Sequence, residues 1–220
     1  MRERGWQIHV TILGMELFLT STISKAAQNI GKGLDLSVRN KLVFVDTAAE
    51  PKEERSDMQW LADDRQALVD AGFDVSDYTI TNKTKDKLEK DLESYDFIYM
   101  SGGDTAYLLK QSQDSGFIDV VKDFVANKGK IYIGTSAGSI IAGPKLPDYF
   151  EEGEYGLKNE NCYGFVNFTI LPHWGTEYFK KKYLDERLKL AYKDNQLPLL
   201  ILTDNQYVHI KNKEMEIVCI

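Results

Sequence analysis

Residues 128–143 read KGKIYIGTSAGSIIAG, and this stretch decides how the rest of the chain is interpreted. The apolar run KIYIG (130–134) predicts a buried strand. It leads into GTSAG (134–138), which has the spacing G-x-S-x-G, and then into small apolar residues typical of a packed helix. In a nucleophile elbow a serine occupies the sharp turn between such a strand and such a helix. The alternative is a glycine-rich turn that happens to contain a serine.

Strand-like and helix-like segments alternate along the chain, which predicts an α/β fold with a mostly parallel sheet covered on both faces. Predicted strands cover 16–21, 41–48, 74–80, 95–103, 130–134, 166–174 and 197–203, and residues 207–220 are expected to form a hairpin around 211–213. Helices are expected over 56–72, 83–94, 117–129 and between 174 and 197, with a helix or loop over 21–34. In such sheets the functional residues follow the carboxyl ends of the strands.

The chain has 220 residues and a net charge of −7, without a linker, a repeat or a low-complexity segment. A single domain of this size can bury a large core. The acidic charge argues against nucleic acid or an anionic membrane as a partner, and no run of 18 apolar residues predicts a membrane span. Cys162 and Cys219 form neither a disulfide framework nor a metal-binding pair, so a reducing compartment is expected.

The amino-terminal residues 1–14 contain two early arginines and a short apolar stretch, but no small-residue cleavage site. Met15 precedes the first predicted strand, so residues 1–14 are interpreted as an extension upstream of a natural start at Met15. The alternative is a genuine extra strand. Residues 15–220 are then expected to form one domain.

A serine hydroxyl needs a base to become a nucleophile. The chain has three histidines, of which His9 lies in the predicted extension and His209 lies in an alternating strand where a structural role is expected. His173 follows Pro172 at the end of a predicted strand, which would bring it to the same edge as Ser136. His173 is therefore the predicted base.

A carboxylate should orient the imidazole through its other ring nitrogen. Asp148 would give the order Ser, Asp, His of the α/β-hydrolases, but Ser136 and His173 are only 37 residues apart, which is short for that fold. Asp204 directly follows a predicted strand and would give the order Ser, His, Asp. The sequence favours Asp204 and keeps Asp148 as the alternative.

The segment MSGGDT (100–105) ends another predicted strand. An oxyanion hole needs two donors directed at one point. Ala137 supplies one backbone amide, and the pair Gly102-Gly103 can bring a second one close without an obstructing side chain. Asp104 is expected either to cap the following helix or to bind a cationic part of a substrate.

In order and spacing, SGGDTAYLLK, YIGTSAGS and ILPHW resemble three motifs of the peptidase E (dipeptidase E, aspartyl dipeptidase) and cyanophycinase family of serine peptidases. The strand MELFLTST also resembles the usual amino terminus of that family. The resemblance covers roughly Met15 to the last residue. It implies a flavodoxin-like three-layer fold similar to class I glutamine amidotransferases, and a cytoplasmic, cofactor-free peptidase that acts on small peptides. A monomer or small homo-oligomer is expected.

By this resemblance Ser136 is the nucleophile, His173 the base, and the amides of Gly103 and Ala137 the oxyanion hole. The family's third member is a glutamate in a loop after a late strand, a place that Asp204 takes here with a shorter side chain. Asp148 corresponds to an aspartate that older assignments place between the serine and the histidine.

Two departures from the family pattern concern the substrate. Aspartyl dipeptidases carry an asparagine where this chain has Asp104, and an arginine near the position of Leu184 to bind the substrate's aspartate. Arg187 or one of Lys180–Lys182 could substitute for that arginine. The leading hypothesis is a serine exopeptidase for short peptides, and a preference for an N-terminal Asp is its finer part. The alternative is a non-catalytic or altered-specificity binding protein that retains the fold.

Overall fold

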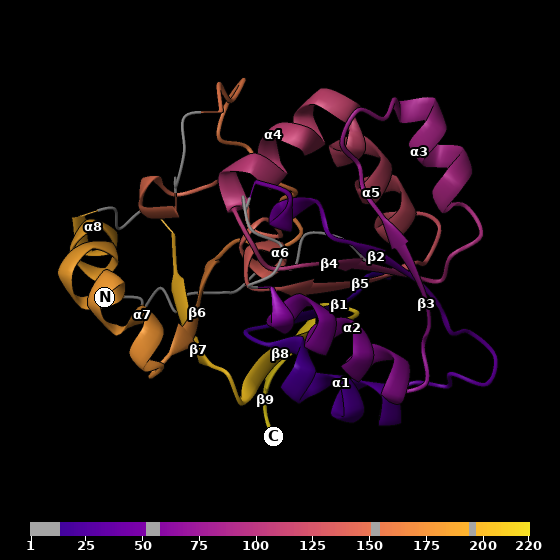
Figure 1. Ribbon diagram of the computed structural model, residues 1–220, viewed down its shortest axis with the longest axis horizontal. Coiled ribbons are helices and arrows are strands. Elements are labelled where there is room, and N and C mark those ends of the chain that lie inside the picture. The colour runs from indigo at the N-terminus through magenta and orange to yellow at the C-terminus, as the bar shows by residue number, and fades with distance from the viewer. Residues whose placement is uncertain (1–13, 52–57, 151–154, 194–196) are drawn as a thin grey trace, which may run out of the picture.

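The computed structural model describes residues 14–51, 58–150, 155–193 and 197–220 (Figure 1). The interpretation of residues 1–14 as an extension falls, except for Gly14, outside these residues and stays a prediction. The first two residues of the predicted helix 56–72 also fall outside them.

A seven-stranded main sheet forms the centre of the molecule, with the order β3-β2-β4-β5-β1-β8-β9 (Figure 1). The first five strands in this order are parallel, β8 runs antiparallel to β1, and β9 runs antiparallel to β8. The mostly parallel α/β fold predicted from the sequence is therefore confirmed, as is the closing hairpin. The strand bounds are β1 (Glu16–Thr20), β2 (Lys41–Val45), β3 (Asp74–Tyr78), β4 (Phe97–Met100), β5 (Ile131–Thr135), β8 (Gln206–Lys211) and β9 (Glu214–Cys219).

Helices cover the two faces of the main sheet and give the fold its three layers (Figure 1). Helices α1 (Ile23–Lys32) and α2 (Gln59–Asp70) pack on one face. The other face is covered by α3 (Lys85–Leu92), α4 (Thr105–Ser115), α5 (Phe117–Ala126) and the short α6 (Ala137–Ile140).

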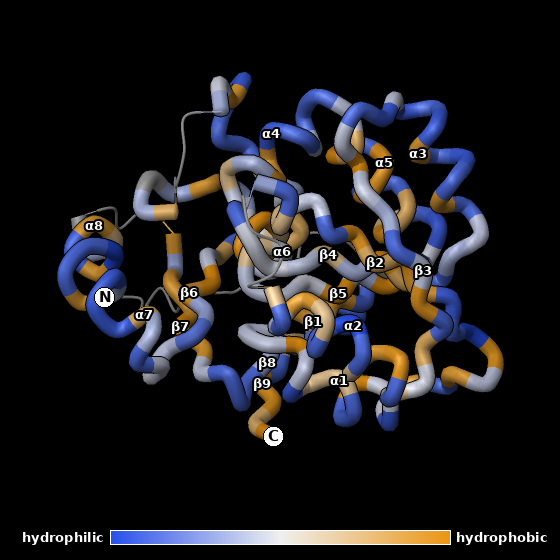
Figure 2. Tube along the Cα trace, in the orientation of Figure 1, coloured by the Kyte–Doolittle hydropathy of each residue, from blue (hydrophilic) through white to orange (hydrophobic). Residues whose placement is uncertain are grey.

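Alternating residues of each central strand enter two different cores. In β2, Leu42 and Phe44 pack with α1 and α2, whereas Val43 and Val45 pack with the helices of the opposite face. A strand buried on both faces has to be apolar throughout, which explains the continuous apolar runs of the sequence. In Figure 2 hydrophobic residues gather along the central strands, whereas the surrounding helices contain many hydrophilic residues. The predicted strand 41–48 is shorter than expected, because Thr47–Ala49 form the 3₁₀ turn η1 and the Ala48 carbonyl accepts from Asp104.

Strands β6 (Thr169–Trp174) and β7 (Leu199–Thr203) form a separate two-stranded parallel sheet, here called the small sheet. The sequence led us to expect these strands in the same parallel sheet as the others. The antiparallel strand β8 instead occupies the edge of β1, where the parallel sheet could have continued. The small sheet still shares a core with the main sheet through Ile170, Leu171 and Leu202.

A helical segment connects the strands of the small sheet. It consists of α7 (Glu177–Lys182), the five-residue π-helical turn η4 (Tyr183–Arg187) and α8 (Leu188–Lys193). These elements lie beside the small sheet, away from the layers of the main sheet (Figure 1).

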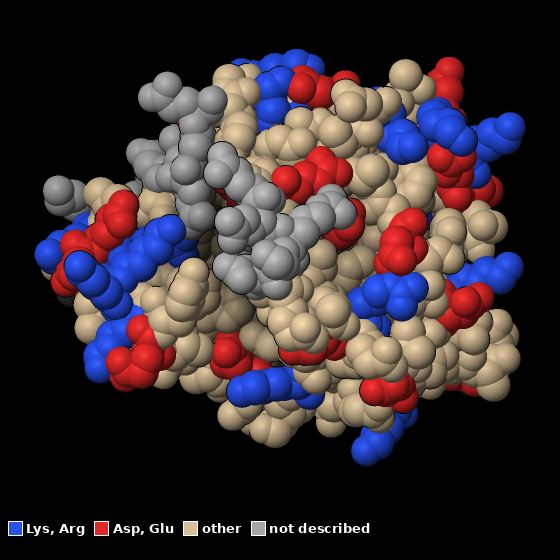
Figure 3. Space-filling model, viewed as in Figure 1, with Lys and Arg blue, Asp and Glu red and all other residues tan. Residues whose placement is uncertain are grey.

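Acidic and basic side chains are interspersed over the surface seen in Figure 3. None of the helices in the described ranges has both the length and the apolar character needed to cross a membrane.

His209 lies on the face of the main sheet, as the sequence led us to expect, and joins three strands. Its ring nitrogens lie 3.1 Å from Glu16 Oε1 and 3.2 Å from Glu216 Oε1, and its ring stacks on Phe18 at 4.3 Å. The hydrogen bonds to Glu16 and Glu216 raise the pKa of His209. Burial acts to raise the pKa of Glu16, but hydrogen bonds from His209 and Lys211 outweigh it and hold that pKa below its usual value.

This cluster predicts a pH-dependent contribution to stability. The raised pKa of His209 means that its stabilisation is complete below the unfolded-state pKa of about 6.5 and is lost as the pH rises through the folded-state pKa. The lowered pKa of Glu16 means that its contribution is lost at acidic pH instead. We expect the urea midpoint of the wild type to exceed that of His209→Gln most at about pH 5 to 6, and the gap to narrow toward pH 9. A gap that stays constant over this range would contradict the prediction.

Candidate active site

Ser136 occupies the sharp turn between β5 and α6. Its backbone has φ 50° and ψ −108°, a conformation that non-glycine residues rarely adopt. The glycines on either side are required by close contacts: a Cβ at Gly134 would lie 2.5 Å from the Gly138 carbonyl oxygen, and one at Gly138 would lie 2.2 Å from the Met100 carbonyl oxygen. The sequence GTSAG therefore forms the tight turn that the elbow spacing predicted.

Two contacts hold Ser136 in place. Its backbone amide donates to the Thr20 carbonyl at the end of the neighbouring strand β1 (3.1 Å). Its hydroxyl oxygen lies 3.0 Å from Nε2 of His173. The serine thus faces the imidazole with hydrogen-bonding geometry.

His173 comes from β6, at a break in the pairing of the small sheet between Leu171 and Trp174. Pro172 has no N–H to donate to a ladder, which favours the break at this point. The backbone of His173 also has a positive φ, 61°. Phe179 on α7 stacks on the imidazole with ring centroids 4.7 Å apart and planes 7° apart, so one face of the ring is packed against an aromatic side chain.

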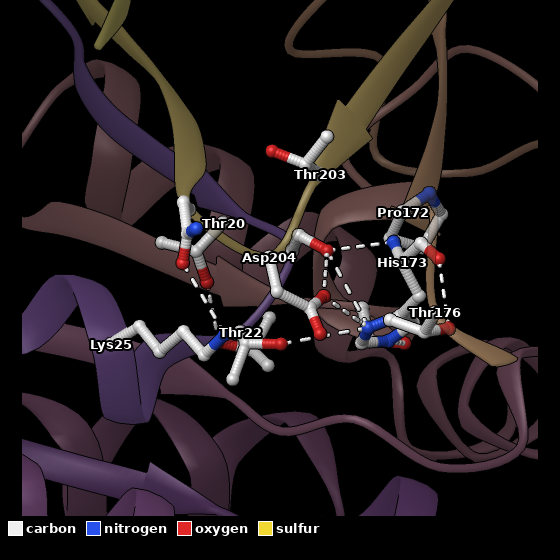
Figure 4. Close-up of polar contacts among 12 residues, drawn as sticks. Thr20, Thr22, Lys25, Pro172, His173, Thr176, Thr203 and Asp204 are labelled. Atoms are coloured by element: carbon white, nitrogen blue, oxygen red, sulfur yellow. Dashed lines mark hydrogen bonds and ion pairs between the residues drawn. The ribbon is translucent and has the colours of Figure 1, made fainter. Parts of the chain in front are cut away.

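Asp204 directly follows β7 and its carboxylate points toward the imidazole of His173 (Figure 4). Its Oδ1 atom lies 2.8 Å from His173 Nδ1 and accepts from the Ser21 hydroxyl at 2.7 Å. Burial acts to raise the pKa of Asp204, but the hydrogen bonds from His173 and Ser21 outweigh it and lower that pKa to about 2. The carboxylate is therefore ionised at neutral pH.

The hydrogen-bond pattern fixes the tautomer of the imidazole. An ionised carboxylate only accepts hydrogen bonds, so Nδ1 of His173 carries the proton that Asp204 binds. The lone pair of Nε2 then faces the Ser136 hydroxyl, which donates to it. This arrangement suits removal of the serine proton by the imidazole and stabilisation of the imidazolium by the carboxylate.

The glycine pair lies beside the serine. A Cβ at Gly102 would lie 3.3 Å from the Cβ of Ser136, and one at Gly103 (φ 136°) would lie 2.1 Å from the Ala48 carbonyl oxygen. Across the ranges that the structure describes, no hydrogen bond comes from the amides of Gly103 or Ala137. Their role as an oxyanion hole remains a prediction.

Asp104 caps helix α4, since its Oδ1 accepts from the Tyr107 amide at 2.9 Å. Its Oδ2 accepts from the hydroxyl of Tyr155 at 2.7 Å. The capping role considered for this residue is thus present, and its role in binding substrate stays a prediction.

The remaining candidates are the alternative orienting residue, Asp148, and the residues considered for binding an acidic substrate side chain. Asp148 begins the 3₁₀ turn η3 (Asp148–Phe150), and its side chain is outside the described part of the structure. Leu184 is half exposed on η4, whereas Arg187 is buried, with its guanidinium over the rings of Phe150 and Tyr183. Arg187 is therefore packed against aromatic rings, and Lys180 is paired with Glu177.

Sequence reasoning missed three residues that contact the His173–Asp204 pair. Ser21 and Thr22 directly follow β1 and approach Nδ1 of His173 at 3.4 and 3.5 Å, and Phe179 stacks on the ring. Ser21 and Thr22 follow a strand end, so the same criterion that selected Asp204 could have identified them. No pattern in the sequence points to Phe179. Among the residues in the described ranges, no cluster of acidic, histidine and cysteine side chains could hold a metal ion.

Comparisons with known proteins show which family and which solved structures the chain is similar to. The model of peptidase family S51 matches residues 17–218. An uncharacterized peptidase of Listeria innocua is 30% identical over 205 residues, which cover 90% of this chain and 94% of that protein. A Drosophila melanogaster protein named as a probable alpha-aspartyl dipeptidase is 26% identical, over 68% of this chain and 62% of its own.

A crystal structure of a Listeria monocytogenes protein provisionally named peptidase E has the same fold. Its TM-score is 0.80 at 24% identity, and the match covers 94% of this chain and 98% of the other. This agreement supports the three-layer architecture around the mostly parallel sheet.

The two candidate orienting carboxylates can be separated by one pair of substitutions. Asp204→Asn should reduce the rate at which a fluorophosphonate probe labels Ser136 by on the order of 10³-fold, because an amide no longer selects the reactive tautomer. Asp148→Asn is the matched comparison and should leave labelling near the wild-type rate. A large loss in Asp148→Asn with little change in Asp204→Asn would reverse the assignment.

Proposed function

Because the chain belongs to peptidase family S51, we propose that it is a serine-type exopeptidase that hydrolyses short peptides through an acyl-enzyme on Ser136. One observation carries the proposal. Ser136, His173 and Asp204 form a continuous hydrogen-bonded line, 3.0 Å from serine to histidine and 2.8 Å from histidine to aspartate.

In the acylation step the Ser136 hydroxyl oxygen attacks the carbonyl carbon of the scissile peptide bond. Nε2 of His173 takes the hydroxyl proton, and Asp204 stabilises the resulting imidazolium through Nδ1. The imidazolium then gives its proton to the leaving amine, the carbon–nitrogen bond breaks, and the acyl group stays on Ser136. In the second step water attacks the ester with His173 as base, and the serine is regenerated.

Negative charge develops on the carbonyl oxygen in both steps. We assign the amides of Gly103 and Ala137 to this oxygen, because both follow strand ends next to Ser136 and neither amide donates a hydrogen bond to any other residue that the structure describes. Each such donor contributes on the order of 10²- to 10³-fold in rate when it is directed at the oxyanion.

The preferred first residue of the peptide is the finer part of the proposal. We propose a preference for substrates with an N-terminal Asp because one relative is named as a probable alpha-aspartyl dipeptidase. Asp104 lies just beyond the glycine pair, and a carboxylate at that place suits an ammonium group of the substrate. Arg187 is buried, so it does not present an exposed guanidinium to an acidic side chain on the first residue of the substrate.

Removal of the nucleophile tests the central proposal. Ser136→Ala should fold like the wild type, lose fluorophosphonate labelling and lose at least about 10³-fold in peptide hydrolysis, since no acyl-enzyme can form. Circular dichroism and the urea midpoint check the fold. Full peptidase activity in this variant would refute the mechanism, and a wild type that neither labels nor hydrolyses would favour a binding protein that retains the fold.

Substrate preference can be read from a dipeptide library offered to the purified protein. Asp-X dipeptides cleaved faster than neutral X-X dipeptides would support the N-terminal Asp preference. Equal or faster cleavage of neutral dipeptides would remove that preference and keep the exopeptidase. A parallel assay with Asp104→Asn should alter the preference at the substrate's amino-terminal side if Asp104 contacts it.

A further inference from the structure

The reacting groups come from two different sheets. Ser136 ends β5 of the main sheet, whereas His173 and Asp204 belong to β6 and to the end of β7 in the small sheet. Among the strands that the structure describes, those of the small sheet are not hydrogen-bonded into the main sheet. The 3.0 Å contact between the Ser136 hydroxyl and the His173 imidazole therefore depends on the interactions that fix the small sheet relative to the main sheet.

We propose that Ser21 is a positioning residue, which holds the His173–Asp204 pair of the small sheet in register with the Ser136 nucleophile of the main sheet. The inference rests on the proposed function of that site. The hydrogen bonds of the Ser21 hydroxyl within the described structure go to His173 and Asp204 and not to the reacting hydroxyl of Ser136, so Ser21 acts through these two residues.

The Ser21 hydroxyl makes two short hydrogen bonds across this boundary. It accepts from the backbone amide of His173 at 2.7 Å and donates to Oδ1 of Asp204 at 2.7 Å. One side chain thus fixes both the main chain of the base and the carboxylate that orients the base. The bond to the amide also supports the rarely adopted backbone conformation of His173 (φ 61°).

The residue before Ser21 holds the nucleophile. The Thr20 carbonyl accepts from the Ser136 amide at 3.1 Å and from the Ser139 hydroxyl at 2.7 Å. The Thr20 hydroxyl donates to the Gly134 carbonyl at 3.0 Å. Two consecutive residues therefore hold the two halves of the site. Thr20, the last residue of β1, binds the elbow, and Ser21, directly after it, binds the histidine and the aspartate.

Ser21 itself has little freedom to move. Its side chain is fully buried, and β1 is paired with β5 on one edge and with β8 on the other. The first turn of α1, just after Ser21, is fixed because the Ser24 amide donates to the buried Asp64 at 3.2 Å. A hydroxyl held so rigidly is suited to define the position of its partners.

The test compares Ser21→Ala, Ser21→Cys and Ser21→Thr with Ser112→Ala. Cysteine fills the same space with a much weaker hydrogen-bonding group, and threonine restores the hydroxyl. Ser112 is the matched control, because it is also a fully buried serine with two hydroxyl contacts, to the Leu108 carbonyl at 2.7 Å and to the Tyr163 hydroxyl at 2.9 Å. It lies in α4 and is not part of the site.

We expect Ser21→Ala and Ser21→Cys to lower kcat and the fluorophosphonate labelling rate by on the order of 10- to 100-fold with little change in KM, the effect of one lost hydrogen bond to a charged group. Ser21→Thr should recover most of the loss. Ser112→Ala should lose stability without losing kcat.

A second readout does not depend on hydrolysis. Nuclear magnetic resonance of the His173 imidazole should show a protected Nδ1–H proton in the wild type that is lost or shifted in Ser21→Ala and Ser21→Cys, and unchanged in Ser112→Ala. Wild-type rates and an unchanged imidazole signal in both Ser21 variants would overturn the inference. A wild type without peptidase activity would count against the proposed function alone, because the imidazole signal still decides the role of Ser21.

Discussion

The contact between Gly138 and the end of β4 is the constraint on which the site depends. A Cβ at residue 138 would lie 2.2 Å from the Met100 carbonyl oxygen, so only a glycine lets the helix after the elbow approach the neighbouring strand this closely. The Gly138 amide donates to the Ser101 carbonyl across the same contact. This packing turns the chain sharply at Ser136 and brings it beside the glycine pair that ends β4. The strained serine backbone is thus maintained by packing on both sides.

The site is assembled from parts with different structural supports. The elbow and the glycine pair belong to the rigid centre of the main sheet, where both faces of each strand are covered. The histidine and the aspartate belong to the small sheet, whose connecting helical segment also supplies Phe179 against the imidazole. Tyr183, farther along this segment, stacks on Phe179 and donates its hydroxyl to the Pro172 carbonyl at 2.5 Å. His173 is therefore supported by the helical segment of the small sheet as well as by Ser21.

The sequence was sufficient for the fold class, because strands buried on both faces must be apolar throughout and helices must alternate with them. It was also sufficient to identify Ser136, His173 and Asp204 as candidates, since each lies at or directly after the end of a predicted strand. The structure brings the three together. It did not reveal that β6 and β7 leave the main sheet. That outcome depends on β8 taking the edge of β1, a pairing between distant segments that no local pattern encodes. The roles of Ser21 and Phe179 depend on the same tertiary arrangement.

Strand β1 lies between partners that are distant in the chain: Leu17 pairs with Tyr132 of β5 and with Ile210 of β8. Pairings between such distant segments form slowly, because the entropy of closing a long loop must be lost before the contacts form. Until β8 docks, β1 presents an open edge that is prone to aggregation. Strand β8 begins at Gln206, just after Asp204. Pairing of β8 with β1 therefore covers the open edge and also places Asp204 next to Ser21. A chain in which β8 is not paired with β1 therefore also lacks the aspartate in its place beside Ser21 and His173.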